Sequence, residues 1–159
     1  MLGAIIGDIV GSIYEFNNHK SKEFEFFGRD CSFTDDTVHT IAVADWILNR
    51  DAGGPGLADC LVHWSRKYPH KSYGGMFYKW LSGKEYEGKY KPYNSFGNGS
   101  AMRVSPCGWH AKSEQEVIDL ATSSAEVTHN HPQGILGAKA TALAIYKARM
   151  DCSAEDIKK

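Results

Sequence analysis

Apolar residues recur along this chain at helical spacing from the first residues to the last. In the first segment they fall three and four positions apart, which predicts a helix over about residues 2–13. The same spacing predicts further helices over residues 34–48, 57–68, 113–127 and 133–149. No alternating apolar and polar pattern of useful length competes with these helices. We therefore expect an all-α fold.

Polar and glycine-rich stretches separate these helices. Residues 17–32 are rich in Lys and Glu and indicate a solvated loop, and residues 82–99 indicate a long surface loop. Loops of that length inside a compact domain are usually functional or disordered. Residues 153–156 resemble one more helix N-terminus, but too few residues follow for a helix to sustain itself.

Composition narrows the class of protein. With 159 residues, 42% hydrophobic residues and a mean hydropathy of −0.40, the chain fits one soluble domain, residues 1–159. A net charge of −1, a pI near 6.6 and the lack of a long basic run give no support to nucleic-acid or membrane-surface binding, and we expect no sequence-specific nucleic acid as a partner. The first residues lack a basic signal-peptide region, and no stretch is long enough to span a bilayer.

The cysteines point to a compartment. The four are far apart in sequence and form no C-x-x-C pair (Cys31, Cys60, Cys107 and Cys152). This spacing favours reduced thiols in the cytoplasm over a disulfide framework or a zinc site. Cys107 has no neighbour that would activate it, so we interpret it as a core cysteine.

One line of the first helix carries unusual chemistry. Asp8, Ser12 and Glu15 are spaced so that two carboxylates and a hydroxyl share one side of an otherwise apolar helix. Glycines at positions 3, 7 and 11 form a second stripe that allows another group to approach closely. A solvated outer face would explain the acids equally well, but residues 1–18 contain no Lys or Arg to accompany them.

The second candidate is the sequence Phe33-Thr34-Asp35-Asp36-Thr37. Thr and Asp before a helix are ordinary N-terminal capping residues, because their oxygens accept free backbone N–H groups. The alternative is functional: two adjacent carboxylates and a hydroxyl crowd hard oxygen ligands, which suit Mg²⁺, Mn²⁺ or Ca²⁺ better than zinc.

Three weaker signals lie further along the chain. Residues 97–103 form a glycine-rich turn that begins a helix and could present N–H groups to a diphosphate. Most turns of this kind, however, only reverse the chain and bind no ligand. His129 and His131 could hold a metal, but hydrogen bonding to a ligand or capping a helix fits loop histidines better. The aromatic residues between positions 73 and 93 either stack on a base or cover a core edge.

Taken together, these motifs resemble the ADP-ribosylglycohydrolase family. The resemblance rests on four segments in the same order, namely residues 7–15, 33–37, 98–103 and 126–129. It implies an all-α orthogonal helical bundle with a binuclear Mg²⁺ or Mn²⁺ centre at the bottom of an ADP-ribose cleft.

The resemblance also assigns roles to residues. Thr34, Asp35 and Asp36 match the metal-ligand motif, and Glu15 matches a glutamate that gates or assists the reaction. Asp8 matches an aspartate of the first helix that positions the metal-binding residues or has a structural role, without binding the metal itself. The ADP-ribose contacts are implied for Asn98, Gly99, Ser100, Met102 and His129. With Glu15, the two aspartates Asp35 and Asp36 form the implied catalytic group.

The chain departs from the family pattern in one major respect. Members carry a later D-x-D-T/S motif that completes the metal pair, and residues 130–159 do not supply it. We therefore expect a truncated domain that lacks the C-terminal helices, with two-metal binding weak and turnover low or absent. A smaller departure is His39, where the pattern carries an apolar residue.

The resulting hypothesis is a metal-dependent hydrolase that cleaves the glycosidic bond between ADP-ribose and an acceptor, either a protein or a small conjugate. Two alternatives stay open: a non-catalytic ADP-ribose-binding module, and a remnant that self-associates through an apolar face left uncovered on the glycine-striped helix.

Overall fold

The computed structural model describes residues 1–83 and 90–158, and in this part of the chain the regular structure is entirely helical. The α-helices are α1 (Leu2–Gly11), α2 (Asp35–Asn49), α3 (Leu57–Lys67), α4 (Gly75–Ser82), α5 (Gly99–Met102), α6 (Ser105–His110), α7 (Glu114–Glu126), α8 (Pro132–Arg149) and α9 (Ala154–Lys158). Two 3₁₀ turns, η1 (Ser12–Tyr14) and η2 (Arg50–Ala52), extend α1 and α2. The predicted all-α class is confirmed.

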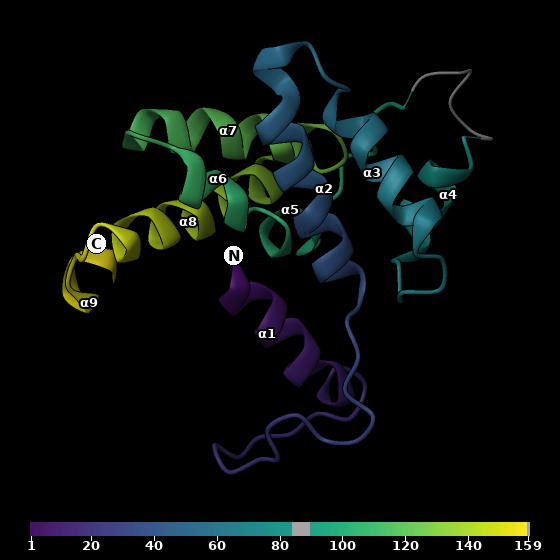
Figure 1. Ribbon diagram of the computed structural model, residues 1–159, viewed down its shortest axis with the longest axis vertical. Helices are drawn as coiled ribbons and strands as arrows, with labels where there is room; N and C mark the ends of the chain where they lie inside the picture. Colours follow the sequence, from purple (N-terminus) through teal and green to yellow (C-terminus); the bar gives the residue numbers. More distant parts are fainter. Residues whose placement is uncertain (84–89, 159) are drawn as a thin grey trace.

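The helices cross rather than align. In Figure 1, α7 and α8 run across the direction of α2, and α5 and α6 fill the space between them. The main packing pairs are α7 with α8, α2 with α3, and α8 with α5 and α6. Buried apolar side chains of α2, α3, α4, α6, α7 and α8 form one continuous core. This core needs no contribution from α1.

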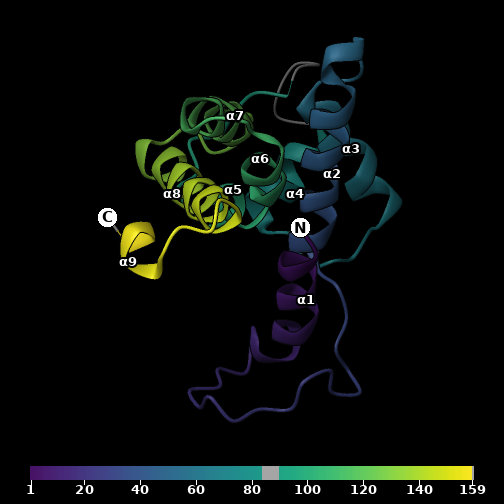
Figure 2. The same cartoon turned by 60° about the vertical axis from the view of Figure 1, so that its left-hand side comes forward.

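Helix α1 lies at the edge of the molecule. It packs against α2, and both views show it projecting from the rest of the bundle (Figures 1 and 2). Its apolar side chains are correspondingly open, with Leu2 76% and Ile6 41% exposed. A Cβ added at Gly3, Gly7 or Gly11 would meet no atom within 4 Å, so this glycine stripe faces open space.

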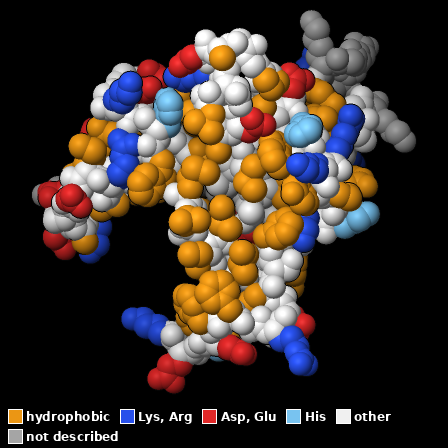
Figure 3. Space-filling view, viewed as in Figure 1, with side chains coloured by type: hydrophobic (Ala, Val, Ile, Leu, Met, Phe, Trp, Pro, Cys, Tyr) orange, Lys and Arg blue, Asp and Glu red, His pale blue; other side chains and the backbone are white. Residues whose placement is uncertain are grey.

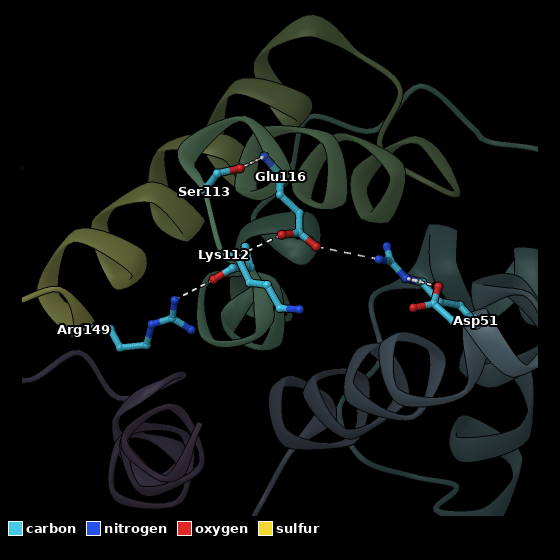
Figure 4. Close-up of polar contacts among 7 residues, drawn as sticks. Asp51, Lys112, Ser113, Glu116 and Arg149 are labelled. Carbon is cyan, nitrogen blue, oxygen red and sulfur yellow. Dashed lines mark hydrogen bonds and ion pairs between the residues drawn. The ribbon is translucent and has the colours of Figure 1, made fainter.

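The helix termini follow local capping chemistry. Ser113 caps α7 by accepting the Glu116 N–H, as its sequence predicts, and the Glu116 carboxylate accepts the Lys112 N–H (Figure 4). Glu116 also pairs with Arg50 at the end of α2, at 3.8 Å. At the other end of this network Arg149 donates to the carbonyl of Ala111, which fixes α8 against the end of α6.

Two sequence expectations need correction. Two short helices, α4 and α6, were not expected; Gly74 is the N-cap of α4, and Pro106 stands in the first turn of α6. The last residues do form a helix, α9: Ser153 caps it at Asp156, and Lys147 of α8 donates to the Asp156 carbonyl. Within the long loop expected over 82–99, residues 84–89 lie outside the described residues, and 90–98 are non-helical.

The structure confirms the interpretation of the cysteines and decides two points that the sequence left open, the aromatic stretch and His39. All four cysteines are free, and Cys107 is fully buried, with burial raising the pKa of its thiol to about 12. Trp80 and Phe77 are buried in the core, so this part of the aromatic stretch covers a core edge. His39 is buried as well: its Nε2 lies 3.2 Å from Ser65 Oγ and its ring meets Phe77 edge-on. None of the described helices combines the length and the apolar character that a membrane crossing requires.

Candidate metal and nucleotide cleft

Asp8 joins α1 to the start of α2. Its carboxylate accepts four hydrogen bonds, from the backbone N–H and the hydroxyl of both Thr34 and Thr37. The Thr34 Oγ1–Asp8 Oδ1 distance is 2.6 Å and the Thr34 N–Asp8 Oδ2 distance is 2.9 Å. Because these donors use most of its lone pairs, Asp8 positions the threonine-aspartate turn instead of facing a ligand.

Thr34 is also the N-cap of α2, where its hydroxyl accepts the Asp36 N–H at 3.3 Å. The capping interpretation and the site interpretation of this motif are therefore compatible. The cap holds the turn, and the carboxylates of Asp35 and Asp36 stay free of ion pairs within the described residues. A second backbone bond, from Asp35 N–H to the carbonyl of Lys71 at 2.7 Å, fixes the turn from the α3 side.

The pKa values of Asp35 and Asp36 are both raised above the ordinary value for aspartate. Burial, followed by the neighbouring Asp36 charge, raises the pKa of Asp35 to about 7. Burial, followed by the charges of Asp8 and then Glu15, raises the pKa of Asp36 to about 6. Burial is the leading cause of both pKa shifts, and the carboxylates that gather here without a paired cation add to it.

Asp35 and Asp36 face different hollows. Asp36, Thr34, Asp8, Ser12 and Glu15 line a cleft of about 470 Å³, here called the α1 cleft. Its remaining wall comes from the glycine stripe of α1 and from residues of α5, α6 and α8, including Ala101, Ser105, Thr141 and Ile145. The predicted acidic line of α1 thus faces the predicted acidic turn across one cleft.

Asp35 lines a second hollow of about 300 Å³, here called the loop cleft. Its wall includes Ser95, residues 97–99, Tyr93, His129, His39 and Arg103. Asn98 and Met102 line both clefts, so the glycine-rich turn stands between them. The two clefts therefore adjoin at this turn, with Asp36 lining one and Asp35 lining the other.

The glycine-rich turn is shaped by His129. A Cβ at Gly99 would lie 2.8 Å from His129 Cε1, so only glycine lets the ring pack against this turn. Thr128 Oγ1 lies 2.7 Å from His129 Nδ1, which leaves Nε2 as the ring nitrogen for a ligand. Burial, and then the nearby charge of Arg103, lowers the pKa of His129 to about 4, so the ring is neutral at pH 7.

Not every predicted contact residue reaches the clefts. The hydroxyl of Ser100 is buried and donates to the carbonyl of Gly134 at 2.8 Å, so this side chain braces α8 and lines neither cleft. His131 caps α8 by accepting the Gln133 N–H, one of the two roles expected for loop histidines. Asn98, Gly99, Met102 and His129 all line the loop cleft.

Two buried residues were not assigned a role from sequence. Arg103 is 1% exposed, donates to the Ser124 carbonyl and the Thr128 hydroxyl, and has an unpaired Nε. His39, directly below Asp35 on α2, has an unpaired Nδ1. The signal for Arg103 was its place one residue after Met102 in the glycine-rich motif, but a buried cation cannot be told from an exposed one by sequence.

The donor set is suited to a hard divalent cation but is incomplete. Asp35, Asp36, Glu15 and the Thr34 hydroxyl offer oxygen ligands of the type that Mg²⁺ and Mn²⁺ prefer. Within residues 1–83 and 90–158, however, no three His, Cys, Asp or Glu side chains come close enough together to form a metal-binding group. The cluster of unpaired carboxylates fits a cation, and further ligands are needed to hold two.

In the described residues, an all-helical scaffold places an acidic turn and a glycine-rich turn at two neighbouring clefts. Comparison with known proteins identifies the family: the sequence profile of the ADP-ribosylglycohydrolase family matches residues 1–159. The chain belongs to the ADP-ribosylglycohydrolase family.

The similar curated proteins are ADP-ribosylhydrolases ARH3. Identity is 30% to the mouse protein (Mus musculus) over 98% of this chain, 30% to the human protein (Homo sapiens) over 93%, and 29% to the frog protein (Xenopus tropicalis) over 93%. These matches cover 50%, 48% and 49% of the relatives, respectively. The chain therefore spans about half the length of the curated relatives it matches.

Proposed function

We propose that this chain contributes to hydrolysis of the glycosidic bond that links ADP-ribose to a protein or small acceptor. The observation that carries the proposal is the convergence of Glu15, Asp36 and Thr34 on one cleft, with Asp35 beside it and no cation paired to these carboxylates in the described residues. Family membership and the printed activity of the ARH3 relatives support the same reaction class.

In this proposal Thr34, Asp35, Asp36 and Glu15 hold Mg²⁺ or Mn²⁺. Bound there, the cation pair would orient the distal ribose and lower the pKa of a water. Asp8 keeps the Thr34 turn in place, and Glu15 accepts the proton of that water as its oxygen bonds to the anomeric carbon. The bond to the acceptor breaks through an oxocarbenium-like state, and the acceptor atom takes up, as it leaves, the proton that Glu15 received.

The loop cleft supplies nucleotide binding in the same proposal. Gly99 and Asn98 place backbone and amide groups where a diphosphate passes between the two clefts. Neutral His129 presents Nε2 as a hydrogen-bonding group, and Met102 gives an apolar contact. We propose that the isolated chain turns over slowly, since the described residues supply too few ligands for two cations.

The test is Mg²⁺-dependent release of ADP-ribose from a modified protein. Asp35→Ala with Asp36→Ala should lower the rate by more than about 100-fold, since the cation would lose its principal ligands. A control pair, Asp151→Ala with Glu155→Ala, removes two exposed carboxylates far from the clefts and should leave the rate unchanged. A rate that resists both EDTA and the Asp35/Asp36 pair would overturn the metal mechanism.

A second candidate function is ADP-ribose binding without turnover. Two observations favour it. The residues around the loop cleft are held by buried hydrogen bonds, whereas the described carboxylates supply too few ligands for a metal centre. Calorimetry with ADP-ribose distinguishes the two: binding without measurable release, at any Mg²⁺ concentration, supports the binding module.

We also propose self-association through α1, in a reducing, cytoplasmic setting suggested by the four free thiols. Exposed Leu2 and Trp109 line an apolar hollow of about 370 Å³ with Met1 and Gly3. Sedimentation should then show a concentration-dependent dimer that Leu2→Asp abolishes, whereas a monomer at all concentrations would contradict it.

A further inference from the structure

Residues 60–83 differ in charge from the rest of the chain. They contain four cations, namely Arg66, Lys67, Lys71 and Lys79, two histidines and no Asp or Glu. The chain carries 18 Lys and Arg against 19 Asp and Glu, so the segment is +4 and the remainder is −5. A balanced total therefore conceals a strongly basic region.

The fold gathers this region on one face, formed by the second half of α3, the loop after it and α4. Figure 3 shows Lys, Arg and His side chains over this side of the molecule, interleaved with hydrophobic ones. The helix dipole explains Arg66 and Lys67 in the last turn of α3, but not the lack of carboxylates through residue 83. We name it the α3–α4 face.

Aromatic rings hold the cations at this surface. Lys67 Nζ lies 4.7 Å from the centroid of the Trp64 ring, and Lys71 Nζ lies 3.7 Å from that of Phe33. The rings of Trp64 and Tyr68 are parallel to within 3°. The Asp45 carboxylate accepts a hydrogen bond from the Trp64 indole N–H at 2.8 Å, and this bond fixes the orientation of the ring.

A hollow of about 310 Å³ opens between α3 and α4 in the middle of this face. Arg66, His70, Tyr73 and Tyr78 line it together with Ser65, Pro69, Leu81 and Ser82, and no described carboxylate is among its lining residues. The ring of Tyr78 is 58% exposed and makes no ring contact with another described residue.

From this arrangement we propose that the α3–α4 face binds single-stranded nucleic acid without sequence preference. Cations interleaved with accessible rings match a phosphodiester chain with unpaired bases, since phosphates pair with Arg and Lys and bases stack on aromatic faces. An acidic peptide would use the cations but leave Tyr78 without a partner. This binding stands apart from the proposed hydrolysis, because it uses neither the carboxylates nor the glycine-rich turn.

The test is fluorescence anisotropy with a labelled oligothymidylate of about twelve nucleotides at about 50 mM salt. Arg66→Glu with Lys67→Glu should weaken binding at least tenfold and flatten its salt dependence. Tyr78→Ala should weaken binding about tenfold with the salt dependence kept, because it removes stacking and no charge. Melting curves of both variants establish that they fold.

The matched control is Lys20→Glu with Lys22→Glu. It makes the same change in net charge on the exposed loop before α2, at the far end of the molecule from α3 and α4. We expect it to bind like the parent chain. Equal losses in the control and the Arg66/Lys67 variant, equal binding of a polyglutamate peptide, or no binding at low salt would each overturn the proposal.

Discussion

The corner around α1 and the region around α5 and α8 are built in opposite ways. At the α1 corner, carboxylates line an open cleft, the glycine stripe touches nothing, and one side chain, Asp8, makes the side-chain hydrogen bonds that tie α1 to the α2 turn. Around α5 and α8, Gly99, Ser100 and Arg103 are enclosed by packed or hydrogen-bonded neighbours. The proposed nucleotide side is thus preorganised, whereas the proposed metal side gathers carboxylates that have no paired cation among the described residues.

The largest change in the free energy of unfolding should come from replacing the buried Arg103. Arg103→Met leaves the Ser124 carbonyl and the Thr128 hydroxyl without their buried donor, which should lower the free energy of unfolding by about 3 kcal/mol. Urea denaturation measures this. Arg50→Met, at a partly exposed ion pair, is the control and should cost less than about 1 kcal/mol.

Asp8→Asn should be next in size, because it breaks the main hydrogen-bonded link between α1 and α2. An amide oxygen cannot replace both carboxylate oxygens as acceptor for Thr34 and Thr37, so the loss should be about 2 kcal/mol. In a hydrogen-exchange experiment, the backbone amides of α1 should exchange faster than in the parent chain, while the exchange rates of the α8 amides should be unchanged. Unchanged α1 protection would show that the helix is held by other contacts.

A pair of glycine substitutions tests the contrast directly. Gly99→Ala places a Cβ against the His129 ring and should cost about 2 kcal/mol together with ADP-ribose binding. Gly7→Ala meets open space in a helix interior and should stabilise the chain by about 1 kcal/mol. Thermal melts and calorimetry report both. Destabilisation by Gly7→Ala would mean that α1 packs more closely than described.

The smallest effect is the pH dependence from Asp35 and Asp36. Their pKa values in the folded chain, about 7 and about 6, lie above the usual value, so folding is favoured at low pH and disfavoured as pH rises from about 4 to about 7. Without divalent cations, Asp36→Asn should therefore stabilise the chain at pH 8 by about 1 kcal/mol, after allowance for partial solvent screening, and should have little effect at pH 4. Added Mg²⁺ should remove the advantage by stabilising the parent alone; melts at both pH values are the measurement.

The long helices could be predicted from the sequence because their apolar spacing is regular, and the caps at Thr34 and Ser113 follow from local chemistry. A shared cation and the family resemblance linked the Asp8–Glu15 line to the Asp35–Asp36 pair, since spacing along one helix says nothing about what faces it. The contacts of Arg103 and His39 depend on tertiary burial, and the bracing role of Ser100 depends on the approach of α8. Pattern alone carries none of that information.

The attachment of α1 has a mechanical consequence. Because the Asp8 carboxylate accepts hydrogen bonds from two threonines at the start of α2, it sets the position of α1 relative to that turn. Glu15 follows α1 and η1 directly, so the placement of Glu15 opposite Asp36 depends in part on a carboxylate that is neither of the two.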